Sequence, residues 1–169
     1  QTFTTLAAPV VTTAAATLVT GSTATLNGSA NPSGNSATGW FRYSTINPVT
    51  CNDTFGTRAP LSSGTLLGSG TVPTPYTANI SGLTSGTTYY YCAIASNSVG
   101  TGVGNVMTFS TPGAPTVATL AATAVSSSVA TLNGSADPRG GDTTGYFRFS
   151  TTNPGVCNNT FGVRAPGSG

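Results

Sequence analysis

The chain repeats itself at one fixed spacing, and this repeat constrains its fold more than any other feature. The segment ATLNGSA occurs at 24–30 and again at 130–136, a shift of 106 residues. With that shift and no gap, residues 23–60 match residues 129–166 at 25 of 38 positions. Self-similarity at a constant spacing is the signature of repeated structural units. We therefore expect tandem repeats of about 106 residues each.

The repeat also predicts how the chain is divided. TFTT at 2–5 corresponds to TFST at 108–111 under the same shift. We expect residues 1–6 to be the last strand of a preceding repeat, residues 7–112 a complete repeat, and residues 113–169 the first part of the next. That first part would hold three strands and the loop that follows them. On this interpretation the chain is a section of a longer polymer; the alternative is that another chain completes the fold.

Short apolar segments alternate with turn residues along the complete repeat, a pattern typical of an all-β domain. Thr, Val, Ser and Gly are abundant, and Gly and Pro separate the apolar segments. No segment has the length or periodicity of a helix. The pattern predicts seven strands, within 9–20, 22–30, 38–44, 64–70, 75–83, 87–97 and 105–111. Seven short strands at this spacing favour a sandwich of two sheets.

One stretch makes the fold class more specific. GLTSGTTYYYCAIASNSVGTGVG, at 82–104, resembles the E–F corner and F strand of bacterial fibronectin type III-like domains, with Leu83, Thr87 and Tyr89 at the positions of their L-T-P-G-T-x-Y motif. Ser85 replaces the usual proline. The resemblance implies an immunoglobulin-like, seven-stranded β-sandwich. It also implies that Tyr89 forms a tyrosine corner, its hydroxyl bonded to nearby backbone. Another immunoglobulin-like sandwich is the alternative.

The resemblance also suggests a pairing for the cysteines. In a sandwich of this family the C strand, here 38–44, and the F strand, here 87–97, are neighbours. The loop after strand C can therefore reach the outer face of strand F. We therefore predict a disulfide between Cys51 and Cys92, with Cys157, the repeat equivalent of Cys51, paired outside this segment. A metal site is disfavoured because the chain has no His, and a buried free thiol is the remaining alternative. A disulfide would indicate an oxidising, extracellular location.

Alternation along the strands, combined with the tyrosine corner and strand pattern that the resemblance implies, predicts which side chains face outward from strands C and F. Phe41, Tyr43, Tyr91, Ala93 and Ala95 share the core-facing parity. The opposite parity leaves a candidate contact surface for a sugar ring or another subunit, made of Trp40, Arg42, Tyr90 and Ile94. The alternative is that the loop at 46–62, attached through its cysteine, covers this surface.

The set of ionisable residues argues against catalysis. The chain has five Arg and three Asp, but no His, Lys or Glu, so a serine has no His or Lys to activate it, and the three Asp, which could act as general bases, lie in or beside turns. We expect no enzyme activity, no cofactor and no metal. The aspartates, Asp53 among them, are expected to cap turns rather than bind calcium. The five arginines are scattered singly, so we expect no nucleic-acid partner. No apolar run reaches the ~20 residues that a membrane-spanning helix needs.

These observations predict a mechanical role. We expect a structural repeat of an extracellular or cell-surface bacterial fibre, stalk or adhesin that associates with other copies of the same chain or repeat. Surface glycans are a further candidate partner. The alternative function is an accessory linker or carbohydrate-binding module of a secreted polysaccharide-degrading enzyme.

Overall fold

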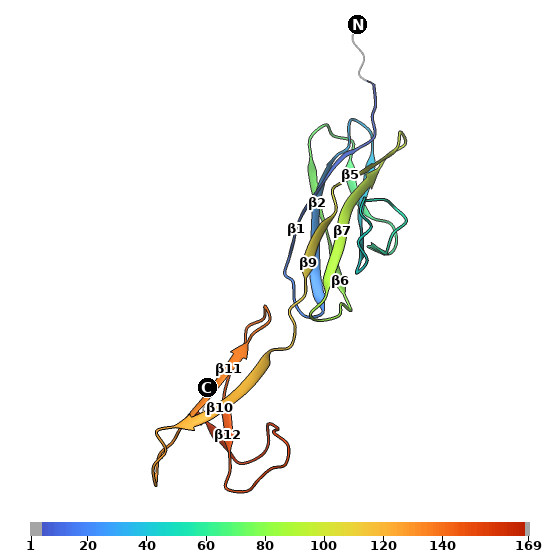
Figure 1. Cartoon of the computed structure of the whole chain (residues 1–169). Coiled ribbons are helices and arrows are strands. Elements are labelled where there is room, and N and C mark those ends of the chain that lie inside the picture. The colour runs from blue at the N-terminus through green and yellow to red at the C-terminus, as the bar shows by residue number, and fades with distance from the viewer. Residues whose placement is uncertain (1–4, 168–169) are drawn as a thin grey trace. The chain divides into compact units, whose positions relative to one another are not determined.

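The computed structural model describes residues 5–167, and all regular structure within them is β-strand. The chain divides into two compact units, residues up to Gly113 and residues from Ala114 onward. The first unit contains β1 (Val10–Thr17), β2 (Thr23–Asn31), β3 (Ala37–Ser44), β4 (Thr57–Ala59), β5 (Thr65–Gly68), β6 (Thr74–Ser81), β7 (Thr88–Ser96), β8 (Thr101–Val103) and β9 (Met107–Ser110) (Figure 1). None of the described residues forms a helix long and apolar enough to cross a membrane.

Two antiparallel sheets make up the first unit in a sandwich-like arrangement. One sheet has the order β1-β2-β6. The other runs β4-β3-β7-β8, with β5 also paired to β3 and β9 also paired to β7. The seven predicted strands all occur, but the structure adds β4 and β8. These two were missed because each is only three residues long and lies inside a loop rich in Gly, Asn and Ser, where sequence alternation has no room to show.

The core between the two sheets follows directly from the alternation of the strands. In β2, Ala24, Leu26, Gly28 and Ala30 are buried, while the residues that alternate with them are partly buried or exposed. The predicted core-facing parity of β3 and β7 is confirmed, since Phe41 and Tyr91 are fully buried in the main core. Burial of each such large side chain stabilises the fold by about 1.5–3 kcal/mol.

Polar contacts also join the two sheets. The buried hydroxyl of Tyr76, on β6, donates a hydrogen bond of 2.9 Å to the carbonyl of Ile94 on β7. The Thr13 hydroxyl, on β1, accepts a hydrogen bond of 3.0 Å from the N–H of Ala93, and the Tyr91 hydroxyl donates one of 2.6 Å to the carbonyl of Ala14. These bonds satisfy polar groups that would otherwise be costly to bury, and they fix one sheet relative to the other.

The second unit contains β10 (Thr116–Thr123), β11 (Thr131–Asp137), β12 (Phe147–Phe149) and β13 (Val163–Ala165). They form two separate two-stranded sheets, β10-β11 and β12-β13. The pairing register of the first unit recurs 106 residues later: Val10↔Asn31 becomes Thr116↔Asp137, with the irregularity near the end of β1 also reproduced in β10. The β3–β4 register likewise recurs between β12 and β13.

Candidate functional site

The predicted contact surface lies on the face of the β3–β7 sheet that points away from the main core. Trp40 pairs with Ile94 across the two strands, and Arg42 pairs with Cys92. Because side chains alternate along a strand, these four point to the face opposite Phe41 and Tyr91. We call these four residues, Trp40, Arg42, Cys92 and Ile94, together with Asp53 and Arg58, the Trp40 cluster.

A disulfide between Cys51 and Cys92 attaches the loop that follows β3 to this face. The predicted pairing is confirmed: the two Cα atoms are 6.0 Å apart and the cysteines are 41 residues apart in sequence. The loop therefore returns across the sheet, and Phe55 and Cys51 pack against a second small apolar core of Trp40, Cys92 and Ile94. Cys157, the repeat equivalent of Cys51, is an exposed free thiol.

The prediction of an exposed aromatic surface is wrong for its two apolar members. Trp40 is only 6% exposed and Ile94 is fully buried, because the loop covers them. Arg42 and Tyr90 are partly buried. The alternative interpretation, in which the loop covers this face, describes the structure. Stacking of a sugar ring on Trp40 would require displacement of the loop.

The polar atoms of the cluster are bonded to one another. The indole N–H of Trp40 donates to Asp53 Oδ1 at 2.7 Å, and Arg42 Nε donates to the same oxygen at 3.0 Å. The Arg42 side chain also reaches the carbonyl of Gly56. Asp53 was expected to cap a turn; instead its carboxylate joins the loop to the sheet, because the disulfide brings the loop back over β3.

Arg58 completes the cluster from the neighbouring strand. Its guanidinium carbon lies 4.7 Å from the centre of the Trp40 ring, a cation–π arrangement. Its nitrogens donate to the carbonyls of Pro60 and Ser63 at 3.1 and 3.3 Å. The stacking on Trp40 was not predicted, because the pairing of Arg42 with Arg58 depends on β4, which the sequence did not reveal.

The second unit carries the equivalents of Trp40, Arg42, Asp53 and Arg58, with two of these residues exchanged. Tyr146 stands at the position of Trp40 and Asn159 at that of Asp53; the Tyr146 hydroxyl donates to Asn159 Oδ1 at 2.6 Å. Arg164 lies 4.4 Å from the centre of the Tyr146 ring, as Arg58 does over Trp40. The donor and its acceptor have therefore changed together, and the contact between loop and sheet is kept.

The two residues singled out by the family motif lie at the other end of β7. The Tyr89 hydroxyl accepts a hydrogen bond of 2.9 Å from the backbone N–H of Thr84. Leu83 is buried, and its N–H donates to the carbonyl of Ser22. Tyr89 also stacks on Phe109, with ring centres 5.4 Å apart. This corner holds the turn before β7 against the start of β2.

The polar groups of the cluster are bonded to one another rather than to an open cavity. Within residues 5–167, no three His, Cys, Asp or Glu side chains come close enough to hold a metal ion. Asp53, the acidic member of the cluster, is engaged by an indole and a guanidinium. Burial raises the pKa of the Tyr76 hydroxyl well above its ordinary value, which makes it a stable hydrogen-bond donor rather than an acid or base at neutral pH.

Comparison with known proteins adds little to this description. No protein-family model matches the sequence, and no curated protein matches it. Two solved structures of the sensor domain of the anti-sigma factor RsgI4 from Pseudobacteroides cellulosolvens are similar at 16% sequence identity. A short form covers 65% of this chain and all of its own length, with a TM-score of 0.46. A long form covers 63% of this chain and 91% of its own length, with a TM-score of 0.38.

Proposed function

We infer that the chain is part of a non-enzymatic tandem array of fibronectin type III-like repeats, acting as the structural backbone of an extracellular bacterial fibre, stalk or adhesin. The observation that carries this proposal is the 106-residue shift, which relates both the sequence and the strand pairing of the two units. A serial array of similar units is the usual basis of an extended, load-bearing molecule.

The coordinated change in the Trp40 cluster supports the repeat. A change at one position alone would leave a donor without its acceptor, at a cost of about 1–3 kcal/mol where the donor is buried, as Trp40 is. Here Trp40 with Asp53 becomes Tyr146 with Asn159, and a hydrogen bond joins each pair. The loop is therefore attached to the sheet in both units, which favours a shared architectural role for this loop.

The disulfide and the tyrosine corner support the remaining parts of the proposal. A disulfide between Cys51 and Cys92 is typical of proteins that fold in an oxidising compartment, hence of export. The bond from the Thr84 N–H to Tyr89 is the contact that the fibronectin type III-like motif implies.

The charges of the first unit favour association between copies. This unit has only three charged side chains, Arg42, Asp53 and Arg58. The first two pair with each other, and the third is held by backbone carbonyls. Neighbouring units or chains therefore meet little electrostatic repulsion, and other copies of the same repeat are the partners we propose.

Electron microscopy and intact mass of the native protein, taken from the medium or cell surface of its source, test this function. We expect threads or filaments with a regular axial repeat, and a polypeptide mass well above 16.7 kDa. Dispersed globules of that mass would contradict the proposal. A catalytic domain in the same polypeptide, together with binding to polysaccharide, would instead support the accessory-module alternative.

A further inference from the structure

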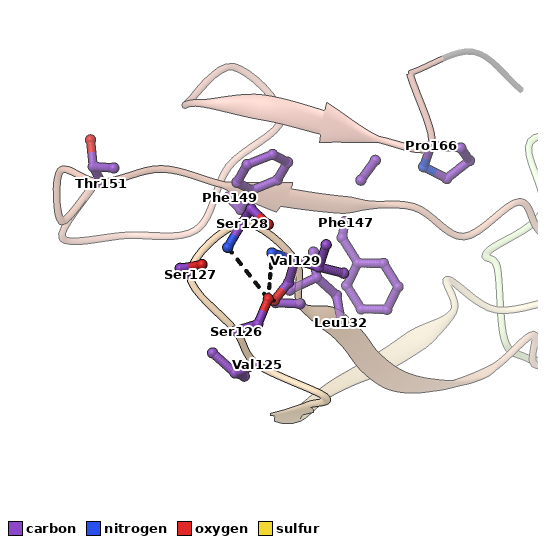
Figure 2. Close-up of a pocket in the computed structure, with 12 residues that line it drawn as sticks. Val125, Ser126, Ser127, Ser128, Val129, Leu132, Phe147, Phe149, Thr151 and Pro166 are labelled. Carbon is purple, nitrogen blue, oxygen red and sulfur yellow. Dashed lines mark hydrogen bonds between the residues drawn. The ribbon is translucent and has the colours of Figure 1, made fainter.

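The second unit has an open apolar groove where the first unit has a closed core. The groove has a volume of about 890 Å³. Figure 2 shows Phe147, Phe149 and Leu132 along it, and at one end a turn in which the Ser126 hydroxyl accepts from the N–H of Val129 at 3.1 Å. Its lining is Val125, Ser126, Ser127, Ser128, Val129, Ala130, Leu132, Phe147, Phe149, Thr151, Ala165 and Pro166.

The equivalent residues of the first unit identify what covers such a groove. Leu26 and Phe41, which correspond to Leu132 and Phe147, are fully buried. The Phe41 ring packs on Tyr76 of β6, with ring centres 4.9 Å apart. Tyr43, which corresponds to Phe149, meets Tyr89 of β7 at 6.3 Å, whereas Phe149 is 49% exposed. The covering strands therefore include β6 and β7.

A pair of equivalent glycines gives independent evidence. A methyl group on Gly39 would lie 2.9 Å from two ring carbons of Tyr76, so the glycine makes room for that ring. A methyl group on Gly145, at the same position of the second unit, meets no atom within 4 Å. The glycine is present in both units, but the ring that requires it is present in one.

In the second unit, β11 and β12 each lack the further partner strand that β2 and β3 have in the first unit. In the first unit β2 pairs with β6 as well as β1, and β3 pairs with β7 as well as β4. Within residues 114–167, β11 pairs with β10 and β12 pairs with β13, and neither has a further neighbour. Unpaired strand edges are templates for an added strand.

We propose that this groove is a docking site for a segment of the same polypeptide built like residues 64–113, which adds strands equivalent to β6 and β7 to β11 and β12. A second copy could supply these strands only by withdrawing them from its own first unit, which would open the core around Tyr76 and Phe109. A segment linked to the second unit has no such cost and benefits from a high effective concentration. The inference rests on the repeat in the proposed function, and is independent of fibre formation.

Extension of the chain tests the inference. A copy of residues 64–113 is fused after Gly169, and hydrogen exchange is compared between the 169-residue chain and the extended chain. We expect amides of β11 to become about 100-fold more protected in the extended chain, because local opening then requires the loss of a core. As a matched control, the fused copy carries serine in place of the residues equivalent to Tyr76, Tyr91 and Phe109; this extension should give no protection.

Two further measurements guard against a fused segment that folds poorly. The Gly145→Ala substitution should leave the 169-residue chain unchanged but weaken protection in the extended chain, just as Gly39→Ala should weaken the first unit. Under oxidised glutathione, the thiols of Cys157 and the fused equivalent of Cys92 should form one disulfide, releasing two molecules of reduced glutathione.

An extended chain with no gain in β11 protection and no such disulfide would overturn the proposal. Protection of β11 already present in a dimer of the 169-residue chain would also overturn it, in favour of a second copy. Success of this experiment together with globular native particles would leave the docking site intact and refute only the fibre.

Discussion

At the scale of single residues, the first unit is stabilised by a few buried polar side chains in an unusually uncharged molecule. Asp53 accepts from both Trp40 and Arg42, and Tyr76 bridges the two sheets through the carbonyl of Ile94. The Tyr76 bond is buried and the Trp40 bond is half-buried, and an unmatched donor is costly in such places. Loss of one partner should therefore matter more than loss of an exposed ion pair.

Substitution of Asp53 tests the cluster. Asp53→Ala leaves the indole N–H of Trp40 without an acceptor and should lower the free energy of unfolding by about 1–3 kcal/mol. Asp53→Asn keeps an acceptor oxygen, as Asn159 does for Tyr146, and should cost less than half as much. Urea unfolding followed by Trp40 fluorescence measures both. Equal losses for the two variants would show that charge, not the hydrogen bond, dominates.

Substitution of Tyr76 tests the bridge between the sheets and its pH dependence. Burial raises the pKa of Tyr76, so above pH ~10 the unfolded phenol ionises while the folded one stays protonated, and stability falls as pH rises. The fall amounts to about 1.4 kcal/mol per pH unit for this group. Tyr76→Phe should cost about 1 kcal/mol at pH 8 and reduce the alkaline loss.

Unfolding curves at pH 8 and pH 11 measure the effect. Part of the alkaline loss should remain in the variant, because burial also raises the pKa of Tyr91 and Tyr43. An identical alkaline loss in the variant and the parent chain would contradict the assignment to Tyr76.

At the scale of elements, the loop between β3 and β4 is the most unusual part of the fold. It has no regular structure of its own, yet it buries Trp40 by crossing the outer face of the sheet. Three attachments hold it there: the disulfide, the Asp53 carboxylate and the carbonyl of Gly56. One covalent bond and several weaker contacts therefore hold the loop on the sheet, although the loop has no regular structure.

Removal of the disulfide tests how much the loop depends on it. The bond closes a 41-residue loop, so its loss in Cys51→Ala/Cys92→Ala should lower the free energy of unfolding by about 4 kcal/mol in the chain-entropy model. Denaturant unfolding of the variant, and of the parent chain with and without reductant, measures this. Cys157→Ala is the matched control and should have no effect, because that thiol is exposed and unbonded. An unfolding midpoint that is the same with and without reductant would contradict the prediction.

At the scale of the whole molecule, the two units differ in completeness. The first has two sheets around a shared core, whereas the second has two small sheets and an exposed apolar groove. In the 169-residue chain, we expect amides of β1 and β2 to exchange far more slowly than those of the equivalent β10 and β11. Hydrogen exchange with mass spectrometry compares them directly, and equal protection would contradict the difference.

The sequence by itself determined the all-β class and the seven longer strands, and the motif resemblance at 82–104 implied the core-facing parity and the Cys51–Cys92 pair. The class and the strands are readable because alternation and turn residues are properties of the chain's order. Only the tertiary structure decided that Trp40 is covered, that Arg58 stacks on it and that Asp53 joins the loop to the sheet. A loop without periodicity carries no signal of where it lies, so its contacts appear only once the disulfide has returned it to the sheet.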